Sequence, residues 1–232
     1  MTLQIDYTTN LPSKLAQHRN GASCFEHLES RFGVRNTDGR YFVGNKVMAI
    51  QDRVKEAIDK LSMNDPINAL IQICIAIDAT GKKEYPKEDT SVRCKNFLAE
   101  NRGFISRVSF GKLVIRGPIL FPFKLQNGTT KHKTLEEVLY HLVRCSLVHE
   151  GDLPNEVEIT PKPQIGMTVD GKVLIPIKML WALILAVIGS PDNKSQRLPP
   201  GYKASIDDVT VDLNEFWGQR ERIYNLVKKH NV

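Results

Sequence analysis

The hydrophobic positions of the chain recur mostly at helical spacing. Between residues 46 and 61, Val47, Ile50, Val54 and Ile58 fall three or four positions apart and predict a helix with one apolar stripe. Residues 67–78 and 177–188 are apolar on nearly every side, so each predicts a helix buried deep in the protein.

Local start and stop signals set the expected ends of the first elements. Asp65-Pro66 supplies an N-cap and a helix-compatible proline at the start of the helix at 67–78. Gly81 and Pro86 are expected to break that helix, and a helical pattern resumes over 90–102.

The next stretch, 104–133, is rich in β-branched and apolar clusters divided by glycine and proline. Asn127-Gly128 adds a turn signal. We therefore expect short extended pieces rather than a helix here, forming a surface insertion.

The strongest local signal is a capping box at Thr134 and Glu137, which predicts a helix from there toward Gly151. Short strands are expected at 157–159, 165–169 and 173–176, with a tight hairpin at Asp170-Gly171 between the last two, giving a small antiparallel sheet. A second box, Asp212-x-x-Glu215, is expected to open the C-terminal helix.

These elements predict a mainly α protein with small β-hairpin elaborations. Residues 1–45 are polar and turn-rich and are interpreted as an N-terminal arm or elaboration. Residues 46–232 are expected to form one helical domain, with strands near 104–130 and 155–176. The longest apolar run has eleven residues, too few for a membrane span of about 20, and the N-terminus lacks a secretory signal. A cytoplasmic protein with no membrane partner is expected.

The formal net charge of +6 is concentrated in the middle of the chain. Residues 79–133 hold twelve Lys and Arg against four acidic residues, a net +8, and the rest of the chain carries −2. A basic segment of this kind is typical of proteins that bind RNA or DNA, and an ordinary solvated face explains it equally well. The candidates for contacts to the nucleic-acid backbone are Lys82, Lys83, Arg93 and Lys95. An ordinary solvated loop would expose the same residues.

Common catalytic signatures are absent from the sequence: it contains no HExxH, GxSxG, GxxxxGK[ST] or GxGxxG. The four cysteines show no metal-ligand spacing, so neither a metal nor another cofactor is expected.

One chemical pattern remains: Arg144 is followed five positions later by His149. Both lie near the end of the helix predicted from Thr134 toward Gly151, which we call the motif helix. Such a pair suits RNA cleavage without a metal. Histidine transfers protons, and arginine donates two hydrogen bonds to the phosphate oxygens that gain negative charge in the reaction. Spacing leaves open whether His149 acts as acid or base, and His141 lies nearby as a further candidate. The alternative is structural: Arg144 pairs with a neighbouring carboxylate and His149 caps the last carbonyls.

The segment LVRCSLVHEG (142–151) resembles the Arg-x4-6-His signature of HEPN-domain proteins (higher eukaryotes and prokaryotes nucleotide-binding), and the helices at 67–78 and 90–102 precede it in a similar order. The resemblance implies a helical bundle that forms a homodimer, and a metal-independent endoribonuclease with Arg144 and His149 as catalytic residues. It further implies a 2′,3′-cyclic phosphate product and a defence, toxin–antitoxin or RNA-processing role with a regulatory protein partner.

Many family members place Asn, Asp or His directly after the motif arginine, where this chain has Cys145. Some relatives bind RNA, a nucleotide or a protein without cutting. The alternative is therefore a non-catalytic binding module on the same bundle, and a third class is a purely structural dimer.

Overall fold

The computed structural model describes residues 3–4, 49–111, 113–124, 128–145, 155–206 and 209–230. Helices dominate these residues, which confirms the mainly α prediction. The α-helices are α2 (Ile50–Ser62), α3 (Pro66–Glu84), α4 (Thr90–Glu100), α5 (Arg102–Phe110), α6 (Leu135–Glu137), α8 (Ile177–Gly189) and α9 (Arg220–His230). A π-helix, η1 (Val138–Cys145), and two 3-10 helices, η2 (Pro191–Asn193) and η3 (Leu213–Phe216), complete the helical set.

The strands form three small sheets. They are β1 (Leu3–Gln4), β2 (Leu120–Lys124), β3 (Thr130–Thr134), β4 (Val157–Thr160), β5 (Gly166–Met167), β6 (Val173–Pro176), β7 (Lys203–Ile206) and β8 (Val209–Asp212). Their orders are β1-β7-β8, β2-β3 and β4-β6-β5.

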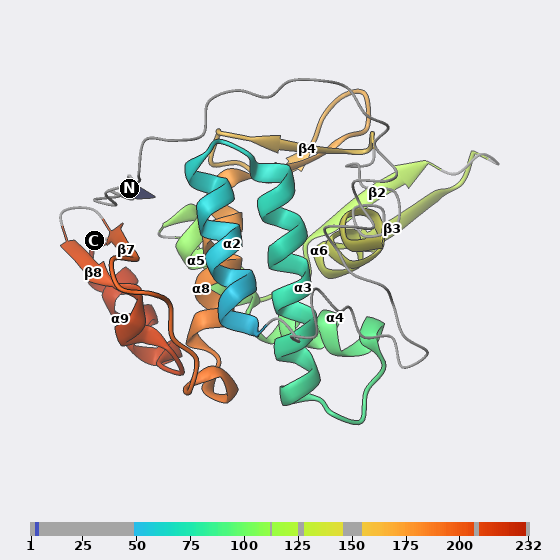
Figure 1. The fold of residues 1–232 in the computed structure, drawn as a ribbon. Helices are drawn as coiled ribbons and strands as arrows, with labels where there is room; N and C mark the ends of the chain where they lie inside the picture. The colour runs from blue at the N-terminus through green and yellow to red at the C-terminus, as the bar shows by residue number, and fades with distance from the viewer. Residues whose placement is uncertain are drawn as a thin grey trace, which may run out of the picture.

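Helix α8 is the centre of the core. Nearly every side chain from Met179 onward is buried, because α2, α3, α5 and α9 all pack against α8 (Figure 1). The predictions of buried helices at 177–188 and 67–78 are both confirmed. No helix in the described part of the chain is both long and apolar enough to cross a membrane.

Helix α3 begins as predicted and ends later. The Asp65 carboxylate accepts a hydrogen bond from the Asn68 backbone N–H at 3.2 Å, and Pro66 occupies the first turn. The predicted break at Gly81 is wrong, since the helix continues to Glu84. A Cβ at position 81 would lie 3.2 Å from the backbone oxygen of Arg93, so this glycine serves close packing of α4 on α3.

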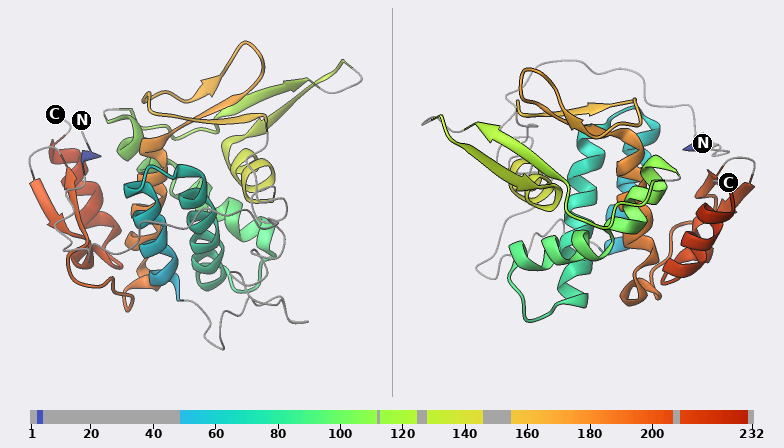
Figure 2. Two further views of the ribbon diagram at one scale, coloured as in Figure 1. Left: turned by 45° about the horizontal axis from the view of Figure 1, so that its top comes forward. Right: turned by 180° about the vertical axis from the view of Figure 1, so that it is seen from behind.

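The prediction of extended structure throughout 104–133 is also wrong in part. Residues 102–110 form α5, whose Phe104, Ile105 and Val108 lie on one face and are buried. Only β2 and β3 are extended, and they pair as an antiparallel hairpin that projects from the helical body (Figures 1 and 2). Gly128, in the predicted turn, has φ +79°, a conformation that glycine adopts without strain.

The small sheet near 157–176 differs from the expected one in strand direction. The hairpin at Asp170-Gly171 is confirmed, with φ +88° at Gly171 and β5 antiparallel to β6. Strand β6 then lies between β5 and β4 and runs parallel to β4, so the sheet is mixed rather than antiparallel.

The C-terminal helix starts later than predicted. The Asp212 carboxylate accepts a hydrogen bond from the Asn214 N–H at 2.8 Å, but the element that it caps is the single turn η3. The chain then turns at Gly218 (φ +75°) before α9 begins at Arg220. The β7–β8 hairpin was not predicted. Within the proposed N-terminal arm, 1–45, the structure describes only β1, which pairs with β7.

Candidate functional site

The motif helix starts at the predicted capping box. The Thr134 Oγ1 accepts a hydrogen bond from the Glu137 N–H at 3.2 Å, and the Glu137 carboxylate accepts one from the Thr134 N–H at 2.8 Å. One α-helical turn follows, α6, and the chain then continues as the π-helix η1. The predicted α-helix is therefore replaced by a π-helix over Val138–Cys145, whose i→i+5 bonding widens each turn.

The two predicted catalytic residues differ in what the structure describes. The backbone of Arg144 lies in the last part of η1. His149 and the predicted helix end at Gly151 lie outside the described residues, so the Arg144–His149 juxtaposition stays a prediction.

An ion pair fixes the start of the motif helix to the bundle. Both Nε and Nη2 of Arg102 lie 2.7 Å from the same carboxylate oxygen of Glu136, whose side chain is only 6% exposed. Arg102 also donates to the backbone oxygen of Arg116 at 3.0 Å, and the Leu135 N–H donates to the backbone oxygen of Ile119 at 2.9 Å. These contacts connect α5 and the motif helix to residues 116–119, the segment that precedes β2.

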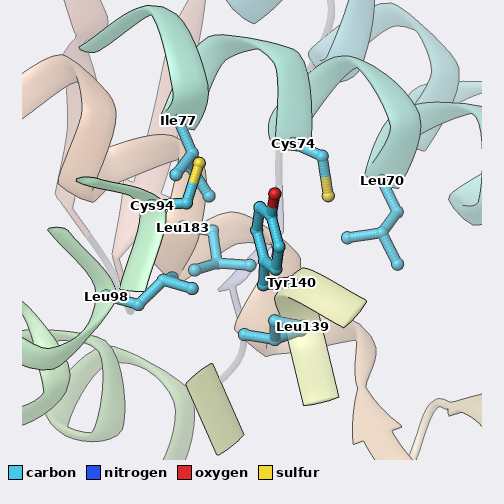
Figure 3. Close-up of a pocket in the computed structure, with 8 residues that line it drawn as sticks. All are labelled: Leu70, Cys74, Ile77, Cys94, Leu98, Leu139, Tyr140 and Leu183. Carbon is cyan, nitrogen blue, oxygen red and sulfur yellow. The ribbon is translucent and has the colours of Figure 1, made fainter. Parts of the chain in front are cut away.

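The inner face of the motif helix lines a small apolar cavity. Figure 3 shows Tyr140 pointing toward α3, between Cys74 and Cys94, with Leu139 beside it. The cavity measures about 10 Å³, room for about one water molecule. A ligand pocket needs several hundred Å³, so a base or nucleotide does not fit in this cavity.

The outer face of the motif helix carries an exposed histidine. The ring of His141 meets that of Tyr140 edge-on, with centroids 4.8 Å apart. The pKa of His141 is lowered, first by partial burial of the ring and then by the positive charges of Lys95, Lys133 and Lys131, while Glu137 acts in the opposite direction. The positive charges that act on His141 thus come from α4 and from β3.

The basic residues singled out from the sequence lie in different environments. The Lys83 ammonium donates to the backbone oxygen of Asp192 at 3.2 Å and to Asn193 Oδ1 at 3.1 Å, so it joins α3 to η2. Arg93 Nε and Nη2 lie 2.8 and 2.6 Å from Asp78 Oδ1, and the arginine side chain is 15% exposed.

Lys82 and Lys95 keep more accessible positions than these two. Lys82 is exposed in the last turn of α3, at the end of that helix remote from the β2–β3 hairpin (Figure 1). Lys95 is half-buried and belongs to the group of lysines around His141. The structure thus brings only Lys95, of the four predicted contacts, to the motif helix.

Sequence reasoning missed Lys131 and Lys133 as site residues. They alternate with His132 along β3, in the sequence Thr-Lys-His-Lys-Thr, so the two lysines share one face of the strand. That alternation was the available signal. Within the described residues, no three His, Cys, Asp or Glu side chains lie close enough to hold a metal ion.

The structure thus defines a mainly helical protein whose motif helix is flanked by a projecting basic hairpin. The family model described as Rv1289 matches residues 49–232, and the chain belongs to this family. The chain is 24% identical over 169 residues to "Uncharacterized protein Rv1289" of Mycobacterium tuberculosis and, equally, to "Uncharacterized protein Mb1320" of Mycobacterium bovis. Each alignment covers 68% of this chain and 78% of the relative. No solved structure matches the chain significantly.

Proposed function

We propose that this protein is a HEPN-like, metal-independent endoribonuclease that acts on RNA in the cytoplasm. The observation that carries the proposal is the position of the motif helix, which packs against α4 and directly follows β3. Its exposed His141, three residues before Arg144, lies in the positive field of Lys95, Lys131 and Lys133. A surface of this charge attracts a polyanion such as RNA.

The proposed reaction is transphosphorylation. The 2′-hydroxyl of a ribose loses its proton and attacks the adjacent phosphorus, and the 5′-oxygen leaves with a proton from an acid, giving a 2′,3′-cyclic phosphate and a free 5′-hydroxyl. Arg144 is assigned to the phosphate oxygens, because a guanidinium donates two parallel hydrogen bonds to them. His149 is assigned to proton transfer.

The resemblance to HEPN proteins supports two further proposals about assembly. A homodimer would place two motif helices in one particle, and a regulatory protein partner would control access to the RNA. Both rest on the resemblance.

The test is cleavage of a labelled, structured RNA in EDTA by the wild type, Arg144→Ala and His149→Ala. We expect the wild type to cut and leave a cyclic phosphate. Each variant should lose at least about 100-fold in rate, the usual contribution of one proton-transfer group for His149 and of one donor to transition-state charge for Arg144. Arg222→Ala is the matched control, because Arg222 is an exposed arginine on the remote helix α9.

Circular dichroism checks that all variants are folded. If the wild type binds RNA without cutting it, or if the variants cut as fast as the wild type, the nuclease proposal is wrong. The protein is then better described as a non-catalytic binding module.

A further inference from the structure

Three lysines from two elements form one basic surface beside the motif helix. Lys131 and Lys133 lie on β3, which leads directly into the motif helix, and Lys95 lies on α4, which packs against that helix. The positive charges of all three lower the pKa of His141. We call Lys95, Lys131 and Lys133 the hairpin surface. The three positive charges come from segments far apart in sequence, so the fold, and not a basic run, assembles them.

The described part of the chain supplies no counter-charge to the hairpin surface. Among the residues that the structure describes, no carboxylate forms a salt bridge with any of the three lysines. The nearby acidic side chains have other partners. The Glu137 carboxylate accepts a hydrogen bond from the Thr134 N–H in the capping box, and Glu136 pairs with Arg102. Within the described residues, the three positive charges of the surface therefore stay available to an external anion.

The hairpin also holds its charges in a defined arrangement. The Lys133 ammonium lies over the Phe123 ring, 4.8 Å from the ring centroid, a contact that orients the cation without neutralising it. Lys131 lies opposite Phe123 in the strand register. Residues two apart in a strand are about 6.8 Å apart, so the two ammonium groups can meet different phosphates of one strand.

We propose that the hairpin surface is the binding site for the RNA backbone, which it guides across the outer face of the motif helix. This inference deepens the proposed function and rests on it for the identity of the substrate. An elongated polyanion fits better than a small anion, because Lys131 is exposed on β3, in the hairpin that projects from the helical body (Figure 2). Phosphate contacts of this kind position the substrate and carry no sequence information.

The test measures binding separately from cleavage. The probe is a fluorescent RNA hairpin with 2′-O-methyl groups on every ribose, which removes the attacking hydroxyl. Its dissociation constant is measured by anisotropy from about 50 to about 200 mM salt. The variant carries Lys95→Gln, Lys131→Gln and Lys133→Gln. The matched control carries Lys203→Gln, Lys228→Gln and Lys229→Gln, three exposed lysines on β7 and α9 with the same change in charge.

Each lost phosphate contact lowers the slope of log affinity against log salt by about 0.7 for a single strand and about 0.9 for a duplex. Three contacts give a slope change of about 2.1–2.7. Across this fourfold range of salt, wild-type affinity should therefore decrease about 20- to 40-fold more than that of the hairpin variant. The control should keep the wild-type slope. Equal slopes for the two variants would overturn the inference.

Other anionic partners are tested with the same proteins. Vesicles of phosphatidylserine and phosphatidylcholine, and an acidic peptide, replace the RNA. Loss of binding to either one in the hairpin variant, with RNA binding unchanged, would assign the surface to that partner and refute RNA.

Cleavage assays with unmodified RNA separate this inference from the proposed function. Wild-type protein that binds RNA through the hairpin surface and does not cut it supports the inference and contradicts the nuclease. Wild-type protein that cuts, with an unchanged KM in the hairpin variant, supports the nuclease and contradicts the inference. The expected result is a raised KM with kcat unchanged, because the lysines bind substrate and transition state alike.

Discussion

Replacing Glu136 with Gln should test whether one buried ion pair holds the motif helix in place. The Glu136 side chain is 6% exposed and its partner Arg102 is 17% exposed, so removal of the carboxylate leaves a largely buried guanidinium without its counter-charge. Breaking a buried pair in this way costs about 3–5 kcal/mol of folding free energy. Arg102 keeps its hydrogen bond to the Arg116 backbone, so we expect the lower end, about 3 kcal/mol.

The assay is reversible urea unfolding followed by circular dichroism, with thermal unfolding as a second measurement. For a domain of this size, about 3 kcal/mol corresponds to a Tm lowered by about 6–12 °C. The double variant Arg102→Met, Glu136→Leu should recover most of the loss, because apolar replacement of both partners removes the unpaired charge.

The exposed pair Arg222–Glu215 is the matched control. Its side chains are 56% and 52% exposed, and the guanidinium lies 2.5 Å from the carboxylate. Glu215→Gln should cost less than about 1 kcal/mol, since water screens such a pair. The reasoning would be refuted if Glu136→Gln cost no more than Glu215→Gln.

Two more changes test the packing of the C-terminal half. Burial raises the pKa of Glu84, against the hydrogen bond from Ser190 and the charge of Arg220. The folded state then holds this proton more tightly than the unfolded state, so the contribution of Glu84 to stability is greatest below pH 4.5 and decreases as the pH rises above it. Glu84→Gln should flatten this part of the stability–pH curve measured by urea unfolding, and an unchanged slope would contradict the assignment. Gly218→Ala should lower the free energy of unfolding by at least about 1 kcal/mol, because φ at this residue is +75° and an added Cβ would lie 2.6 Å from the Cβ of Lys194. A variant that unfolds at the wild-type Tm would contradict this prediction.

The predictable part of the fold is the part where one periodicity dominates. Helix α8 is apolar on every side and α2 has a clean stripe, so hydrophobic spacing alone located both. Helix α5 was missed because its nine residues follow α4 almost without a break, include Gly103 and end at Gly111, and glycines also suit turns. Burial of Phe104 and Val108 decides in favour of a helix, and burial is a tertiary property that propensity does not contain.

The candidate site also has a part that could be predicted from the sequence and a part that could not. The capping box at Thr134 depends on contacts three residues apart, and it was read correctly from the sequence. The π-helical continuation through η1 was not, because a change from i→i+4 to i→i+5 bonding depends on how Leu139 and Tyr140 pack against α3 and α4. The offset between Arg144 and His149 therefore could not be converted into an angle from sequence alone.

The assignment of the basic residues shows why a count of charges is not enough. Arg93 and Lys95 are two positions apart in α4, and each helical residue turns the chain by about 100°, so the two side chains leave on nearly opposite sides. Arg93 faces α3 and pairs with Asp78, whereas Lys95 belongs to the group around His141. Both add one charge to the same basic segment, but among the described residues Arg93 pairs with a carboxylate and Lys95 does not. If RNA binds where we propose, Lys95→Gln should weaken binding by itself, and Arg93→Gln should act first on the packing of α4 against α3.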